Sequence, residues 1–186
     1  MIVVGVDPSL SCTGIAIADT RTGHVRTSRV QSEPLAPARP PTMHQLEART
    51  TRIVWCAGRI LNTVPERFDL VVVEHPSTAR PYGLLEDRCA LYMDVVRILQ
   101  RRGPVMPVTA ATRAKYATGS GNAKKKVVLD AVRASMPDLA IADHNVADAV
   151  SLALMGARWL GAPLDMVGKQ QMEAFGNVPW PEKEQD

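Results

Sequence analysis

The chain opens with an apolar run that ends on an acid. Residues 1–6 read Met-Ile-Val-Val-Gly-Val, and Asp7 follows, before Pro8, Ser9 and further small residues that favour a turn. This pattern predicts a buried strand that delivers a carboxylate to an edge of the hydrophobic core. A core does not require an acid at this point, so Asp7 is a candidate contact for a metal or a phosphate. The simpler alternative is that Asp7 only opens an Asx-type turn.

Two more acids lie at the end or along the side of apolar elements. Glu74 closes the apolar run 70–73, and Asp148 lies within 145–154, which has helical periodicity. Solvated surface charge does not produce this pattern. Each acid also has a simpler structural role: Glu74 would pair with an arginine such as Arg80, and Asp148 would be a polar residue beside a buried stripe.

The composition is that of one soluble globular domain. The 186 residues are 46% hydrophobic and 22% charged but only 4% aromatic, so aliphatic side chains must fill the core. No apolar stretch approaches the roughly 18 residues of a membrane span, and no basic region followed by a long apolar segment opens the chain. We therefore expect a cytoplasmic protein that does not bind membranes. The three cysteines have no metal-binding spacing and are expected to be reduced thiols.

The order of the elements predicts an α/β fold. Strands are predicted at 2–6, 13–18, 24–30, 70–74 and 105–108, the first three as an antiparallel meander. Helices are predicted at 43–64, 84–102, 112–116, 123–135 and from about 143–145 to 160. The proline-rich segment 33–41 is expected to be a loop. This order implies a mixed sheet flanked by helices, in which the first and fourth strands can lie side by side and bring Asp7 and Glu74 together.

The end of the chain has no clear periodic pattern. We expect residues 1–161 to form the domain and residues 162–186 to be an acidic tail that is mobile or loosely docked. Its candidate anchors are Met172, Phe175 and Trp180.

Basic residues are concentrated in one segment. Between residues 109 and 133 the chain carries six basic residues against one acid, although its formal charge is only +3. Lys124, Lys125 and Lys126 open a predicted helix, where ammonium groups and free backbone N–H groups are presented to phosphates. The helix dipole opposes lysines at that end, and a bound phosphate would relieve the conflict. Together with Arg113 and Lys115 these lysines predict DNA contact, while a solvated surface is the alternative for each lysine alone.

Three blocks within residues 1–160 resemble RuvC-like Holliday junction resolvases, which are nucleases of the ribonuclease H superfamily. The blocks are Gly5-Val6-Asp7-Pro8-Ser9 with the later Thr13-Gly14, the apolar strand that ends at Glu74, and Gly119-Ser120-Gly121-Asn122-Ala123 with the lysines and the helix of Asp148 behind it. The resemblance implies a ribonuclease H-like, mixed five-stranded sheet flanked by helices, and a crossover junction endodeoxyribonuclease activity.

The resemblance also implies a metal site. The implied metal-binding and catalytic residues are Asp7, Glu74 and Asp148. The cofactor is Mg²⁺, with Mn²⁺ as a substitute, and two Mg²⁺ ions roughly 3.5–4 Å apart can activate water and stabilise the leaving oxygen. The family's fourth ligand, Asp or His, is replaced here by Asn145, so the candidates for this position are Asn145, Asp143 and His144.

The implied partners are branched DNA and a second copy of the chain, because two symmetric cuts resolve a four-way junction. We expect the homodimer interface on the second long helix, at Leu85, Cys89, Tyr92, Val96 and Leu99. The aromatic wedge that many relatives carry after the second acid is replaced by His75-Pro76-Ser77-Thr78 or supplied by Tyr82.

Two other functions stay open. The chain could be a non-catalytic DNA-binding module with a degenerate acidic site, as Asn145 suggests. Its opening turn also occurs at the phosphate site of actin-like nucleotide-binding proteins, although the short length disfavours that reading.

Overall fold

A computed structural model of the chain describes residues 1–33, 42–77 and 85–182. Most of the proline-rich segment 33–41, as well as Arg80 and Tyr82, lies outside the described residues. The strands are β1 (Ile2–Asp7), β2 (Cys12–Asp19), β3 (His24–Gln31), β4 (Leu70–His75) and β5 (Val105–Thr109). The helices are α1 (Met43–Thr63), α2 (Leu85–Leu99), α3 (Ala110–Thr118), α4 (Lys125–Ser135), α5 (His144–Trp159) and α6 (Lys169–Gly176).

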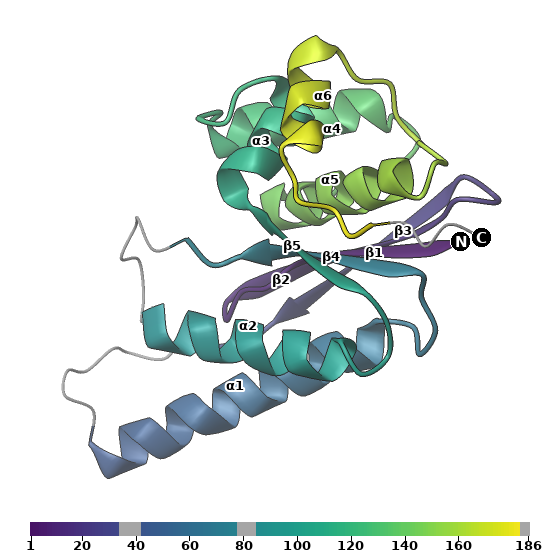
Figure 1. Ribbon diagram of the computed structural model, residues 1–186. Coiled ribbons are helices and arrows are strands. Elements are labelled where there is room, and N and C mark those ends of the chain that lie inside the picture. The colour runs from purple at the N-terminus through teal and green to yellow at the C-terminus, as the bar shows by residue number, and fades with distance from the viewer. Residues whose placement is uncertain (34–41, 78–84, 183–186) are drawn as a thin grey trace.

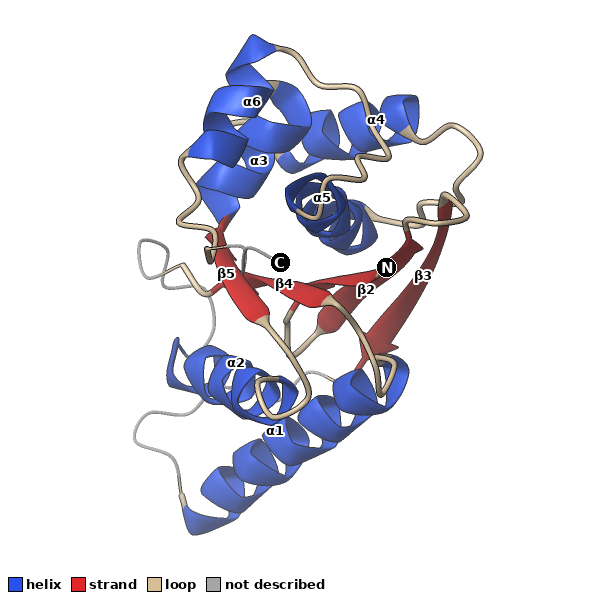
Figure 2. Cartoon of the chain, turned by 45° about the vertical axis from the view of Figure 1, so that its right-hand side comes forward, coloured by secondary structure: helices blue, strands red, loops and turns tan. Residues whose placement is uncertain are grey.

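The five strands form one mixed sheet between two helical layers (Figure 1; Figure 2). Their order is β3-β2-β1-β4-β5, in which β1, β2 and β3 form an antiparallel meander and β4 pairs in parallel with both β1 and β5. The predicted α/β fold with a mixed five-stranded sheet is therefore confirmed, and β1 and β4 are neighbours as expected. The predicted helices are present with ends shifted by a few residues, whereas α6 was not predicted.

Each face of the sheet has its own apolar core, because alternate side chains of a strand point to opposite faces. Val4 and Val6 of β1 pack with α1 and α2, while Val3 packs with α5. Helix α5 is buried from Val146 to Ala157 between the sheet and the outer helices α3, α4 and α6. Even so, no helix within the described ranges is long and apolar enough to cross a lipid bilayer.

The face of α2 on which we expected a dimer interface belongs instead to the core. Tyr92, Val96 and Leu99 are buried in the cluster shared with α1 and the sheet. These three side chains are therefore not available to a second copy of the chain, and the prediction of an interface through them is corrected.

The segment after Gly161 folds back over α3 and α5. The rings of Trp159 and Trp180 stack with their centroids 6.0 Å apart, and Phe175 packs on Trp180. Met172, the third expected anchor, is 42% exposed. The domain boundary at residue 161 stays a prediction.

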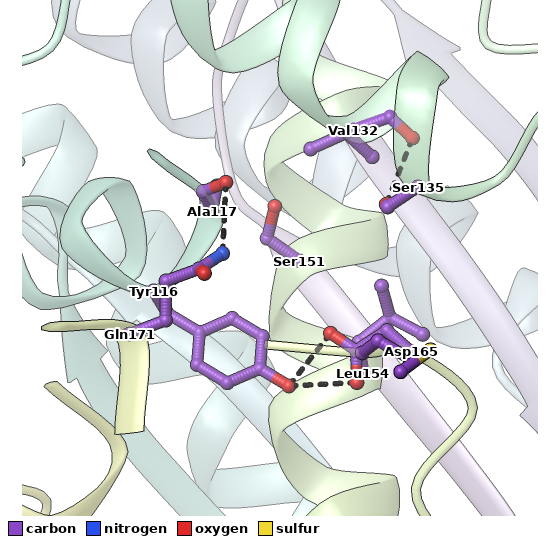
Figure 3. Close-up of a pocket in the computed structure, with 9 residues that line it drawn as sticks. Tyr116, Ala117, Val132, Ser135, Ser151, Leu154, Asp165 and Gln171 are labelled. Carbon is purple, nitrogen blue, oxygen red and sulfur yellow. Dashed lines mark hydrogen bonds between the residues drawn. The ribbon is translucent and has the colours of Figure 1, made fainter. Parts of the chain in front are cut away.

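A buried polar cluster adds to this docking. The Tyr116 hydroxyl donates to the Asp165 carboxylate at 2.8 and 3.0 Å, next to a cavity of about 20 Å³ (Figure 3). Arg158 donates to the same carboxylate at 2.7 Å and to the Tyr116 oxygen at 3.0 Å. Burial, followed by the charge of Asp165, raises the pKa of Tyr116 and keeps its hydroxyl a donor.

Candidate functional site

Parallel pairing of β1 and β4 aligns two of the three acids. Val6 pairs with Val73, so Asp7 and Glu74 are the next residues at the same edge of the sheet. Both valines face α1 and α2, and the alternation of the strands turns the two acids toward α5. The turn behind Asp7 is held by Thr13, whose Oγ1 donates to the Ser9 carbonyl at 2.8 Å and accepts from the Ser9 N–H at 2.9 Å.

Two glycines allow α5 to reach this edge. A Cβ at Gly5 of β1 would lie 2.0 Å from the carbonyl oxygen of Ala149, and a Cβ at Gly14 of β2 would lie 2.0 Å from that of Asn145. Only glycine leaves room for a helix backbone this close to the sheet. The close approach of α5 brings its Asp148 to the ends of β1 and β4.

The three carboxylates share one electrostatic environment. Burial, and then the charges of Glu74 and Asp148, raise the pKa of Asp7 well above its usual value. Burial raises the pKa of Asp148 to about 7, with Glu74 adding to the effect and Arg113 opposing it. A carboxylate cluster of this kind concentrates negative charge and attracts cations.

Arg113 lies inside this cluster. Its Nε donates to Glu74 Oε2 at 2.6 Å and its Nη1 donates to Asp148 Oδ1 at 2.5 Å. Burial alone would lower the pKa of Arg113. The negative charges of Glu74 and Asp148 raise it by more than burial lowers it, so the guanidinium stays charged. The side chain is only 8% exposed, so our grouping of Arg113 with the DNA-contacting lysines is corrected.

A signal for this role was present in the sequence. Arg113 follows the end of β5 by one helical turn, and β5 runs parallel to β4. The carboxyl ends of parallel strands meet at one edge of a sheet, so a residue directly after β5 reaches the edge of Glu74.

The three candidates for a fourth ligand have different surroundings. Asn145 lies on α5, three residues before Asp148, and lines the same cleft. Asp143 caps α5 by accepting from the Val146 N–H at 3.0 Å, and it pairs with Arg29 Nη1 at 3.0 Å. The Nε2 atom of His144 lies 3.0 Å from the Lys125 ammonium. Asn145 is therefore the best placed of the three.

The acids open into a cleft of about 830 Å³. Its wall includes Asp7, Glu74, Arg113, Asn145, Asp148, Asn122 and Lys125. Lys125 is thus the predicted DNA contact that faces the carboxylates, and its positive charge lowers the pKa of both Asp7 and Asp148. The exposed Lys124 precedes it at the N-cap of α4.

The other two predicted DNA contacts are engaged with acids. Lys126 pairs with Asp130 on the exposed side of α4 at 2.6 Å, and Lys115 pairs with Glu173 of α6 at 3.2 Å.

The chemistry of the donors suits a hard divalent cation. Carboxylate and amide oxygens are the ligands that Mg²⁺ and Mn²⁺ prefer. The Asp7 carboxylate makes no hydrogen bond or ion pair with any residue that the structure describes, which leaves both of its oxygens for a ligand. Within the same residues, however, no three His, Cys, Asp or Glu side chains converge as a ready-made metal site.

The sheet order, the helical layers and the three acids at one sheet edge define a ribonuclease H-like fold. Comparison with solved structures agrees. RuvC of Thermus thermophilus matches with a TM-score of 0.54 and 20% identity, over 89% of this chain and 100% of that one. The same protein in complex with Holliday junction substrate matches with a TM-score of 0.53 and 18% identity, over 89% of this chain and 99% of that one. Fowlpox virus resolvase in complex with substrate Holliday junction DNA matches with a TM-score of 0.52 and 15% identity, over 86% of this chain and 99% of that one.

The sequence is also similar to a curated relative. The crossover junction endodeoxyribonuclease RuvC of Erythrobacter litoralis is 25% identical over 170 residues, which cover 84% of this chain and 92% of that protein. No protein-family model matches the chain. The resemblance to RuvC-like resolvases that the three sequence blocks predicted is confirmed by these matches.

Proposed function

We propose that the chain is a divalent-metal-dependent endonuclease that cuts branched DNA such as four-way junctions. The observation that carries this proposal is the convergence of Asp7, Glu74 and Asp148 on one cleft, at the edge of a sheet shared with RuvC. The similar proteins support the choice of substrate: one is named a crossover junction endodeoxyribonuclease, and two solved relatives are bound to Holliday junctions.

Asp7, Glu74 and Asp148 would hold the metal, with the Asn145 amide as a further oxygen donor. Mg²⁺ is the proposed ion, with Mn²⁺ as a substitute. When bound, such an ion supplies a nucleophilic water and stabilises charge on the leaving oxygen.

The residues around the acids bind and orient the DNA backbone. Lys125 faces the cleft from the first turn of α4, where free backbone N–H groups and its ammonium group both attract a phosphate. The Thr13 hydroxyl, which bonds twice to Ser9, fixes the turn that aims Asp7 into the cleft. Lys124 extends the positive surface outward.

We also propose that the chain acts as a homodimer, since a symmetric junction takes two cuts. An apolar stripe on α1 supports this. Leu46, Ile53 and Ile60 are spaced by seven residues; the last two are buried, but Leu46 is 51% exposed and Met43 is 76% exposed. This half of α1 extends past the sheet (Figure 1), so a second copy can cover it.

One observation favours the alternative of a non-catalytic junction-binding module. Arg113 occupies an oxygen of Glu74 and an oxygen of Asp148, which removes two oxygen donors from a metal ion.

A cleavage assay separates the two functions. A labelled synthetic four-way junction is incubated with the wild type, with Asp7→Asn and with Asp130→Asn, which changes an exposed acid outside the cleft. We expect cleavage with Mg²⁺ by the wild type and Asp130→Asn, and binding without cleavage by Asp7→Asn. A junction that the wild type binds but leaves intact with Mg²⁺, Mn²⁺ and other divalent ions would establish the binding module.

A further inference from the structure

We propose that Arg113 is a resident cation of the acidic cleft and limits it to one divalent metal ion per chain while no DNA is bound. This inference rests on the proposed metal-dependent function and concerns how the site of that function is charged. It differs from the two-ion site that the sequence resemblance suggests.

Charge balance is the first argument. When all three are ionised, Asp7, Glu74 and Asp148 bring three negative charges into a partly buried site. The Arg113 guanidinium and one divalent ion together neutralise them. A second divalent ion would leave a surplus of two positive charges beside Lys125, which also acts on Asp7 and Asp148. Like charges confined at low dielectric repel strongly, so a second ion is disfavoured.

The available oxygen atoms give the second argument. A two-ion site needs one carboxylate to bridge the ions and further carboxylate oxygens for each ion. Arg113 already holds one oxygen of Glu74 at 2.6 Å and one of Asp148 at 2.5 Å. Of the three carboxylates, only Asp7 keeps both oxygens without a bond to another described residue.

Arg113 is also not free to leave when an ion enters. Its side chain is 8% exposed, and its backbone lies in the first turn of α3, whose N-cap Thr109 accepts from the Thr112 N–H at 3.2 Å. Moving the guanidinium away would leave a buried charge without its two partners, which is costly. The guanidinium therefore acts as a fixed counter-ion and not as a mobile latch.

The number of bound ions tests the inference. The full chain, without DNA, is titrated with Mn²⁺ at pH 8, and free Mn²⁺ is counted by electron paramagnetic resonance. We expect one Mn²⁺ for the wild type and two for Arg113→Gln, which removes the charge and frees both oxygens. Arg113→Lys keeps the charge and should still bind one. Lys126→Gln, a matched loss of one positive charge outside the cleft wall, should also bind one.

Each other outcome decides against the inference in a different way. Two ions on the wild type overturn it while leaving the proposed nuclease intact. One ion on both the wild type and a folded Arg113→Gln shows that Arg113 does not set the number. If Arg113→Gln does not fold, the number of Mn²⁺ ions bound by the wild type and by Arg113→Lys still tests the proposal. Two bound ions on either protein overturn it. No bound ion, together with an uncut junction, removes the inference and the proposed function at once.

Discussion

Arg113 and Asp148 form a buried ion pair, Nη1 to Oδ1 at 2.5 Å, between two helices that both reach the carboxyl edge of the sheet. Both side chains are 8% exposed. The same guanidinium holds Glu74, so three elements of the fold, β4, α3 and α5, are joined by one cation. The protonation state of Asp148 is therefore coupled to the stability of the whole site.

The first prediction concerns pH. The pKa of Asp148 is raised to about 7 in the folded chain from an ordinary value of 3.8, chiefly by burial. The folded state thus holds this proton more tightly than the unfolded state, and Asp148 contributes less to stability as the pH rises through that interval. Relative to Asp148→Asn, the free energy of unfolding of the wild type should fall by roughly 2–4 kcal/mol between pH 4 and pH 8.

Urea denaturation in the presence of a chelator measures this difference. Comparison with Asp148→Asn is essential because Asp19 and Asp143, whose pKa values are lowered, stabilise the chain as the pH rises. Parallel pH curves for the two proteins would contradict the prediction.

The second prediction concerns the close approach of α5 to the sheet. Gly14→Ala should lower the free energy of unfolding by about 3 kcal/mol, because its Cβ would lie 2.0 Å from the backbone oxygen of Asn145. Gly58→Ala is the matched control: no described atom beyond the neighbouring backbone of α1 lies within 4 Å of its Cβ, and alanine should stabilise α1 by about 0.5–1 kcal/mol. Chemical denaturation of both variants provides the measurement. If the two substitutions change the free energy of unfolding equally, helix α5 moves away from the new side chain without a loss of stability.

The same glycines show how far the sequence alone could go. The apolar runs that end at Asp7 and Glu74 predicted two strands, the second buried on both faces, and the order of the elements allowed them to be neighbours. The motif containing Gly5 and Gly14 carried the resemblance to RuvC-like resolvases, but the reason for these glycines is the helix backbone that lies against them.

Arg113 was misassigned because a basic residue in a basic segment looks like a phosphate contact. Only the fold shows which side of α3 faces the carboxylates. Helix α6 was missed because the contacts that anchor its segment, the packing of Phe175 and Trp159 on Trp180, are aromatic and follow no helical stripe.

The third prediction tests the docking of the segment after Gly161. Asp165→Ala should lower the free energy of unfolding by about 3 kcal/mol, because it leaves the buried charge of Arg158 and the Tyr116 hydroxyl without their shared acceptor. Glu173→Gln removes an exposed partner of Lys115 and should change stability by less than about 1 kcal/mol. Denaturant unfolding and limited proteolysis of residues 162–182 report both effects. Proteolysis that is unchanged in Asp165→Ala would show that the aromatic contacts hold the segment alone.

The fourth prediction separates the lysines that face the cleft from those engaged elsewhere. Lys125 lines the cleft, whereas Lys115 is paired with Glu173. In an Asp7→Asn background, which keeps the junction intact, Lys125→Ala should weaken junction binding by about tenfold at low salt and reduce the slope of log affinity against log salt by about 1. Lys115→Ala should change both quantities much less, because the charge of its ammonium group is already balanced by Glu173. Fluorescence anisotropy across a salt series measures the two slopes. If both variants lose affinity equally, the segment attracts DNA as a diffuse field and Lys125 makes no specific phosphate contact.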